Sequence, residues 1–198
     1  MTRRPPIIPT MVVLAAVATM IALGVWQLRR AHWKEGLLAQ YAKAETLPPI
    51  IWPTSPLRDD QLPLFRHATG LCLRRVGQRA VAGENRAGEP GYAHIFECST
   101  GAEGPGMSVE VGWSKDPNAK VNWGGGPVSG IIAPDSRKRM RLVAASAPPG
   151  LEPSAAPSIS SIPNNHRSYA LQWFSFAAIA LIIYGLAVRK RWREEPKA

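Results

Sequence analysis

Two long apolar runs without a charged residue lie in this chain, one near each end. The first covers residues 7–28 and the second covers residues 169–188, which is 22 and 20 residues. A helix needs about 20 predominantly apolar residues to cross the hydrocarbon core of a bilayer. The mean hydropathy of −0.10 resembles that of a soluble protein, but it averages these runs with a polar middle. The runs therefore predict a two-span membrane protein rather than a soluble enzyme.

The positive charge of the chain gathers beside the two runs. The formal net charge is +10, from 24 Lys and Arg against 14 Asp and Glu. Nine of the 24 cationic residues flank the runs: Arg3, Arg4, Arg29, Arg30, Lys34, Arg189, Lys190, Arg191 and Arg193. Cations at the ends of a span contact lipid headgroups and oppose translocation. The cations are not interleaved with aromatic residues as in a nucleic-acid platform, so we expect membrane lipid as a partner and no nucleic acid.

The charge distribution also predicts the topology. Two spans place both termini on one side, and the basic residues in segments 1–6 and 189–198 put that side in the cytoplasm. Long loops translocate largely regardless of charge, so the central region is expected in the periplasm. The small-x-small triplet at residues 16–18 lies inside the first run, which favours an uncleaved anchor over a signal peptide. No Ser- and Arg-rich stretch precedes the run, which favours a bacterial inner (cytoplasmic) membrane over an organelle.

One stripe of residues indicates that the first helix continues beyond the span of residues 7–28. Large side chains recur at spacings of three and four, as on one helix face: Trp26, Arg30, Trp33, Leu37 and Tyr41. We therefore expect a helical extension over residues 29–47. The stripe itself is interpreted as anchoring and packing, since indole rings favour the membrane interface.

The region from residue 48 to residue 143 is expected to form a small β-rich domain. Proline is frequent at its start, and short apolar stretches follow that Gly and Pro interrupt. The candidate strands are residues 67–76, 92–97, 108–113, 128–132 and 139–144. Turns are expected at residues 83–88 and 124–126, which are rich in glycine. The sequence leaves the order of the strands open.

Residues 144–163 contain five Ala, five Ser and five Pro and a single charge, Glu152. Such a composition buries little apolar surface, so we expect an extended tether. The second span with its N-terminal cap then covers residues 164–188. The predicted fold class is a membrane α+β protein, in which an antiparallel pair of transmembrane helices flanks a small, mostly β extracytoplasmic domain.

The chain offers no catalytic constellation. It has no Cys-x-x-Cys, no glycine-rich phosphate loop, no His-Glu-x-x-His and no Gly-x-Ser-x-Gly. Its two cysteines, Cys72 and Cys98, both lie in the exported region, where the compartment permits a disulfide. We therefore expect a protein that is not an enzyme.

His166 stands out among the four histidines because it directly precedes the second span. Pro163 and the following Asn164 and Asn165 are typical of a helix start, which places His166 in the first turn. The positive end of the helix dipole disfavours imidazolium and leaves a lone pair for a metal. Tyr169, Ala170 and Trp173 follow on the same face as an aromatic wall with a small gap. This face could hold a haem whose iron binds His166; the alternative is a helix end that is merely capped and anchored.

The two membrane edges also resemble a known family. The stretch 23–30, Leu-Gly-Val-Trp-Gln-Leu-Arg-Arg, followed by Trp33-Lys34, closely resembles the end of the first span in the surfeit locus protein 1 family. Asn164-Asn165-His166, with the later Tyr169-Ala170, Trp173-Phe174 and Tyr184, resembles that family's second span. Weaker landmarks are residues 88–92 and Gly112-Trp113. The family usually has Asn-Arg before this Gly-Trp pair, whereas this chain has Glu110-Val111.

The resemblance implies an assembly factor for haem-copper cytochrome c oxidase that binds haem a at the outer membrane edge. It would assist insertion of haem a into subunit I, with subunit I and the haem a synthesis machinery as partners. By the same resemblance His166 is the expected iron ligand. The alternative is a structural membrane chaperone for oxidase subunits that binds no haem.

The haem hypothesis assigns roles to further residues at the same edges. Trp26, Tyr169 and Trp173 would line the ring, and Arg29 or Arg30 would pair with the propionates. Antiparallel spans bring their outer ends together, so His32 is a hypothetical second ligand of the iron.

Overall fold

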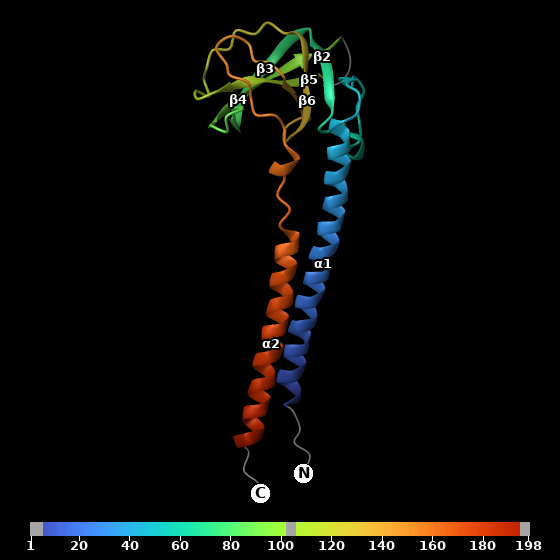
Figure 1. The fold of residues 1–198 in the computed structure, drawn as a ribbon, viewed down its shortest axis with the longest axis vertical. Helices are drawn as coiled ribbons and strands as arrows, with labels where there is room; N and C mark the ends of the chain where they lie inside the picture. The colour runs from blue at the N-terminus through green and yellow to red at the C-terminus, as the bar shows by residue number, and fades with distance from the viewer. Residues whose placement is uncertain (1–5, 102–105, 195–198) are drawn as a thin grey trace. The chain divides into compact units, whose positions relative to one another are not determined.

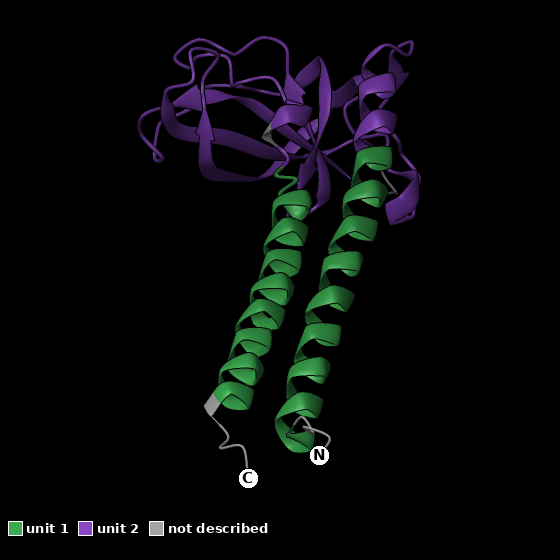
Figure 2. Cartoon of the chain, turned by 60° about the horizontal axis from the view of Figure 1, so that its bottom comes forward, with its two compact units in different colours: residues 1–37, 163–198 green, residues 38–162 purple. Residues whose placement is uncertain are grey.

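A computed structural model describes residues 6–101 and 106–194 of the chain. The chain divides into two compact units (Figure 2). The first, which we call the helical unit, consists of Met1–Leu37 and Pro163–Ala198, and the second, the β unit, consists of Leu38–Ile162. Of the segments expected in the cytoplasm, residues 1–5 and 195–198 lie outside the described residues.

Two long helices form the helical unit: α1 (Ile7–Glu45) and α2 (His166–Glu194). The expected first span and its extension are one continuous helix, whose last turns belong to the β unit. The helices lie side by side in Figure 1. Thr10 near the start of α1 bonds Tyr184 near the end of α2, whereas Gln27 further along α1 bonds His166 at the start of α2. The pair is therefore antiparallel.

Small side chains line the contact between the two helices. On α1 the buried residues are Val17, Gly24 and Ala31, which are seven residues apart. On α2 they are Ala170 and Ala177, again seven apart. A period of seven keeps one narrow face of a helix against its neighbour, and small residues there let two backbones approach closely. The sequence thus specifies the seam by size rather than by hydrophobicity.

Outside this seam, many large apolar side chains in the uncharged runs of both helices are exposed. Each helix is long and apolar enough to cross a membrane, and only 11% and 6% of their most apolar windows are buried. The core helix of a soluble protein would bury most of such a window. The exposed apolar surface is what a lipid environment would cover.

A seven-stranded sheet forms the β unit, in the order β1-β2-β6-β7-β5-β4-β3. Its members are β1 (Ile50–Ile51), β2 (His67–Cys72), β3 (Arg74–Glu84), β4 (Pro90–Ser99), β5 (Met107–Ser114), β6 (Gly126–Asp135) and β7 (Arg139–Ala144). Two 3₁₀ turns, η1 (Asp59–Gln61) and η2 (Ile159–Ser161), flank it. Most neighbours are antiparallel, but β1 pairs with β2 and β5 with β7 in parallel. The two units together give long apolar helices flanking a mostly β domain, as expected.

The sheet differs from the sequence prediction around β3. The expected strand over residues 67–76 is two strands that break at Leu73, and β3 continues to Glu84, into residues expected to form a turn. Cross-strand pairing explains the difference, because β3 pairs with β4 over most of its length, from Arg74↔Ser99 to Glu84↔Pro90. The apolar alternation that marks a half-buried strand is weak here because β3 is an edge strand and largely exposed.

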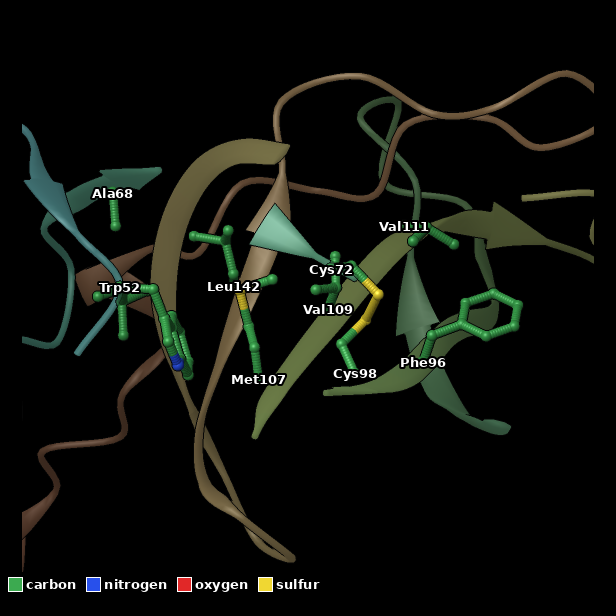
Figure 3. Close-up of a cluster of buried hydrophobic side chains, with 10 residues drawn as sticks. Trp52, Ala68, Cys72, Phe96, Cys98, Met107, Val109, Val111 and Leu142 are labelled. Carbon is green, nitrogen blue, oxygen red and sulfur yellow. A yellow bond between two sulfur atoms is a disulfide. The ribbon is translucent and has the colours of Figure 1, made fainter. Parts of the chain in front are cut away.

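One face of the sheet carries the hydrophobic core, which Figure 3 shows. Its ten buried residues are Trp52, Ala68, Cys72, Phe96, Cys98, Met107, Val109, Val111, Ile132 and Leu142. Cys72 at the end of β2 and Cys98 near the end of β4 form a disulfide inside this core. The disulfide joins β2 to β4, which are not neighbours in the sheet. The sequence alone leaves open whether this disulfide forms.

Residues of the opposite face form a partly buried ionic network. Arg79 Nη2 donates to Asp135 Oδ2 over 2.6 Å, and Arg141 Nε donates to Glu110 Oε2 over 2.6 Å. Glu97 accepts from Arg79 Nε over 3.3 Å. Glu110, which stands at the departure from the family pattern, is thus the partner of Arg141 in the same sheet.

The segment 144–163 differs from a free tether. Trp113 N–H donates to the carbonyl of Glu152 over 2.7 Å, and Glu152 N–H donates back over 2.9 Å. Ala155 N–H donates to the carbonyl of Glu84, and Ser154 is buried. Backbone hydrogen bonds to β5 and β3 therefore fix the middle of the segment to the β unit, although its side chains bury little apolar surface.

Candidate functional site

His166 is the first residue of α2, and its ring is tied to the other helix. The helix start follows from Asn165, whose carbonyl accepts from Tyr169 N–H over 3.1 Å. His166 Nδ1 lies 2.8 Å from Oε1 of Gln27 on α1. Both side chains are half-buried. A hydrogen bond therefore joins the start of α2 to α1 at Gln27, two residues before Arg29.

Charged residues next to this pair also join the two helices. Arg167 contacts both carboxylate oxygens of Glu35, with Nε 2.8 Å from Oε1 and Nη2 3.0 Å from Oε2. Lys34 donates to the carbonyl of Pro163. The side chain of Arg167 is 68% exposed, so the ion pair contributes at most about 1 kcal/mol to stability. Its forked geometry nevertheless fixes the direction in which α2 begins.

The aromatic residues of the expected lining occupy both helices. Trp26 on α1 and Tyr169 on α2 are 55% and 50% exposed, so both rings are open to a ligand or to lipid. Trp173 is half-buried and packs edge-to-face on Phe176, with 6.2 Å between ring centroids. The three rings therefore do not form one closed wall within the protein.

Ala170 corrects one expectation. A small gap is expected at this position between Tyr169 and Trp173, but Ala170 is 1% exposed because it packs in the seam between the helices. A gap in the aromatic face is thus filled by the neighbouring helix. A ring bound at His166 would have to lie beside the seam, where Tyr169 is exposed.

Arg29, Arg30 and His32, the other residues expected at the haem site, differ in their contacts. Arg29 is exposed, whereas the guanidinium of Arg30 lies 4.4 Å from the ring centroid of Trp33 and stacks on it. His32 Nδ1 lies 3.7 Å from Glu35 Oε2, and the His32 side chain is 73% exposed. Glu35 also holds Arg167, so among the contacts of the described residues His32 is linked to α2 through this carboxylate.

Gln27 belongs to the motif at the end of the first span, but the motif alone predicts no role for it. Its signal was available, because Gln27 is a polar residue within an uncharged run and precedes Arg29 and Arg30 by two and three positions. Polar side chains inside a span usually face a protein partner. The Arg167–Glu35 pair gave no such signal, since pairing residues 132 positions apart requires the helix register.

The other histidines lie in the β unit. His67 is exposed on β2, whereas His94 on β4 is fully buried, with Nε2 2.8 Å from Ser114 Oγ. Burial lowers the pKa of His94 below its ordinary value of 6.5, and the carboxylate and backbone of Asp116 partly offset this effect. His94 is therefore neutral at neutral pH.

The weaker family landmarks meet inside the sheet. A Cβ at Gly91 would lie 2.4 Å from Cζ2 of Trp113, and one at Gly112 would lie 2.8 Å from the carbonyl oxygen of Glu152. Glycine at both positions is thus required by close approach. Asn85 is buried and donates to Glu89 and Glu152 while accepting from two backbone N–H groups. The role of Gly91, Gly112 and Trp113 in this structure is therefore to pack a corner of the sheet.

No group of three or more His, Cys, Asp or Glu side chains able to hold a metal occurs within residues 6–101 and 106–194. A metal held by fewer than three of these side chains needs other ligands, such as water or the atoms of a cofactor. A haem iron meets this condition, because the porphyrin supplies four of its ligands and the protein one or two.

The comparison with family models adds an independent observation. The model of the SURF1 family matches residues 14–178. The chain belongs to the SURF1 family. The matched region contains Gln27, the whole β unit and His166, so the match covers both residues of the contact between the helices. No curated protein sequence matches the chain.

Membership of the SURF1 family indicates the general function of the chain. The family is one of cytochrome oxidase assembly factors rather than of enzymes. This agrees with the absence of a catalytic motif from the sequence. The chain is thus associated with the assembly of the oxidase and, through its two apolar helices, with a membrane.

Proposed function

We propose that this SURF1-family protein binds haem a through His166 and assists its insertion into subunit I of cytochrome c oxidase. The observation that carries the proposal is the position of His166, which is the first residue of α2 and is held by Gln27 through Nδ1. Among the hydrogen bonds of the described residues, none involves Nε2 of His166. A neutral imidazole with one nitrogen hydrogen-bonded and the other free is the form that binds iron.

The surroundings of His166 support a large, flat and partly apolar ligand. Trp26 and Tyr169 expose half of their surface on either helix, and Arg29 is exposed beyond them. Aromatic rings pack against a porphyrin, and a guanidinium pairs with its propionates. Haem a supplies the iron and the ring when bound; the protein supplies a ligand, an aromatic contact and a cation.

The proposed setting is the bacterial inner membrane. Both termini lie in the cytoplasm and the β unit in the periplasm, as the basic flanks of the helices predict. The Cys72–Cys98 disulfide supports an oxidising compartment for the β unit. The partners are then subunit I of the oxidase and the haem a synthesis machinery, both of which meet this protein in the membrane.

His32 and Arg30 keep subordinate places in the proposal. His32 is a possible second ligand of the iron, but its contact with Glu35 must then be exchanged. Arg30 stacks on Trp33, which leaves Arg29 as the more available partner for a propionate. We therefore expect His32→Ala to weaken haem binding less than His166→Ala does.

The alternative function is a structural membrane chaperone that contacts oxidase subunits without haem. Purification of the full chain from cells that also make haem a separates the two. Haem binding predicts a red protein with a Soret band, whereas the alternative predicts a colourless protein. Deletion of the gene is expected to lower oxidase activity under either proposal, so this second experiment tests the assembly role itself.

A further inference from the structure

Gln27 of α1 contacts His166, the proposed ligand of the haem iron, across the seam between the helices. Its Oε1 lies 2.8 Å from Nδ1 of His166, and 139 positions of sequence separate the two residues. Both are half-buried, so water competes less for this bond than at an exposed site. The contact occupies Nδ1 and leaves Nε2 as the ring nitrogen available to a metal.

The chemistry of the two side chains links this contact to the protonation of the ring. An amide oxygen only accepts hydrogen bonds, so a bond to Oε1 requires the proton to be on Nδ1. In neutral imidazole the lone pair then lies on Nε2 and can bind iron. If the amide donated instead, Nε2 would carry the proton and could not act as a ligand. The orientation of one amide thus selects between a competent and an incompetent histidine.

Contacts on both sides of Gln27 fix its distance from α2. One turn before it, Gly24 lies against the ring of Phe174, where a Cβ would come within 2.6 Å of Cε1. Two turns after it, Glu35 accepts both bonds from Arg167. The helix pair cannot slide or separate at Gln27 without losing one of these contacts.

We propose that Gln27 is a positioning residue, which fixes the tautomer and orientation of His166 so that Nε2 faces the haem iron. The inference rests on the proposed haem function. A partner that donates or accepts at the second nitrogen of a metal-binding histidine typically changes metal affinity 10- to 100-fold. Gln27 acts through His166 and does not itself touch the iron.

The first test needs no haem. Nitrogen-15 NMR of the imidazole in the full-length protein at neutral pH reports which nitrogen of His166 carries the proton. We expect the Nδ1–H tautomer in the wild type and a shift towards Nε2–H in Gln27→Leu. An Nε2–H tautomer in the wild type would overturn the inference whether or not the protein binds haem.

The second test uses haem a titrated into the purified protein and followed by the Soret band and by the iron–histidine stretching band in resonance Raman spectra. Gln27→Leu is expected to bind about 10- to 100-fold more weakly with a lower stretching frequency. Gln27→Glu, whose carboxylate is a stronger acceptor, is expected to raise that frequency and lower the reduction potential. Gln172→Leu is the matched control, because Gln172 is exposed on α2.

The outcomes separate the two levels of the proposal. Equal affinity and an unchanged stretching band in Gln27→Leu would refute the role of Gln27, even if the wild type binds haem. Unchanged haem binding in His166→Ala would refute the proposed ligand instead. If the wild type binds no haem, the proposed function fails, and the tautomer measurement alone decides whether Gln27 sets the state of His166.

Discussion

Gly24 of α1 lies directly against the ring of Phe174 of α2, because a Cβ at position 24 would come within 2.6 Å of Phe174 Cε1. The two helices can approach this closely only where a side chain is missing. Gln27 lies one turn further along α1, and its Oε1 is hydrogen-bonded there to Nδ1 of His166 at the start of α2. The size of one residue therefore sets the spacing on which the proposed site depends.

Gly24→Ala is expected to destabilise the full-length protein in detergent by about 1–3 kcal/mol, because the added methyl group overlaps the Phe174 ring. Thermal unfolding measures the effect. Gly36→Ala is the control, since nothing lies within 4 Å of a Cβ at position 36. Alanine in a helix interior is favoured there by up to about 1 kcal/mol. In a Phe174→Ala background the penalty of Gly24→Ala should shrink, and a penalty of the same size in both backgrounds would argue against the contact.

Replacement of Cys72 and Cys98 by alanine is expected to lower the free energy of unfolding of the β unit by about 3 kcal/mol, as for a loop closed by a sequence separation of 26. Urea denaturation of the full chain, followed by circular dichroism of the strands, measures the loss. The wild type should lose stability by a similar amount in strong reductant. Equal midpoints with and without the disulfide would contradict this role.

Arg79→Ala is expected to destabilise the β unit by about 3 kcal/mol, because it removes the closer of two cations from the buried Asp135 and the cation paired with the half-buried Glu97. The Asp135 side chain is only 2% exposed, so water reaches it poorly, and Arg141 Nη1 at 3.9 Å is too distant to replace the 2.6 Å contact of Arg79. Denaturant midpoints measure the effect. Glu35→Gln, which breaks an exposed pair, serves as the comparison and should cost less than about 1 kcal/mol. Similar losses in both variants would refute the distinction.

The stability of the β unit should fall as the pH is lowered through 6.5. His94 is fully buried and its pKa lies below 6.5, so the unfolded chain takes up a proton at a pH where the folded chain does not. Unfolding becomes easier by up to about 1.4 kcal/mol per pH unit between 6.5 and the lower pKa of the folded state. Denaturation at pH 7.5 and pH 5.5 measures this, and His94→Gln should reduce the difference. A pH dependence that is identical in the variant would assign the effect to other groups.

The helices could be predicted from the sequence because an uncharged run of 20 residues has few other uses. The extension of α1 beyond the run followed from the periodic stripe that ends at Tyr41, and α1 ends four residues later at Glu45. The strands were less predictable, since β3 lies at an edge and is held by its pairing with β4 rather than by an apolar pattern. The fixation of residues 144–163 was missed for the same reason, because backbone hydrogen bonds of Glu152 and Ala155 leave no trace in composition.

At the candidate site the sequence provided the residue but not its surroundings. His166 could be selected from its place before an apolar run and from a family motif, both of which are local signals. Its contact with Gln27, 139 positions away in the sequence, depends on how the two helices are aligned. The small residues of the seam set this alignment. The burial of Ala170 in that seam was missed because a small residue reads equally as a gap or as a contact.

A titration of haem a into the purified full-length wild type and into His166→Ala tests directly whether His166 is the ligand. We expect saturable binding with a Soret band in the wild type and loss of most of that binding in His166→Ala. His67→Ala, which removes an exposed histidine from the β unit, should behave as the wild type. Equal affinity and an unchanged Soret band in His166→Ala would contradict the central claim.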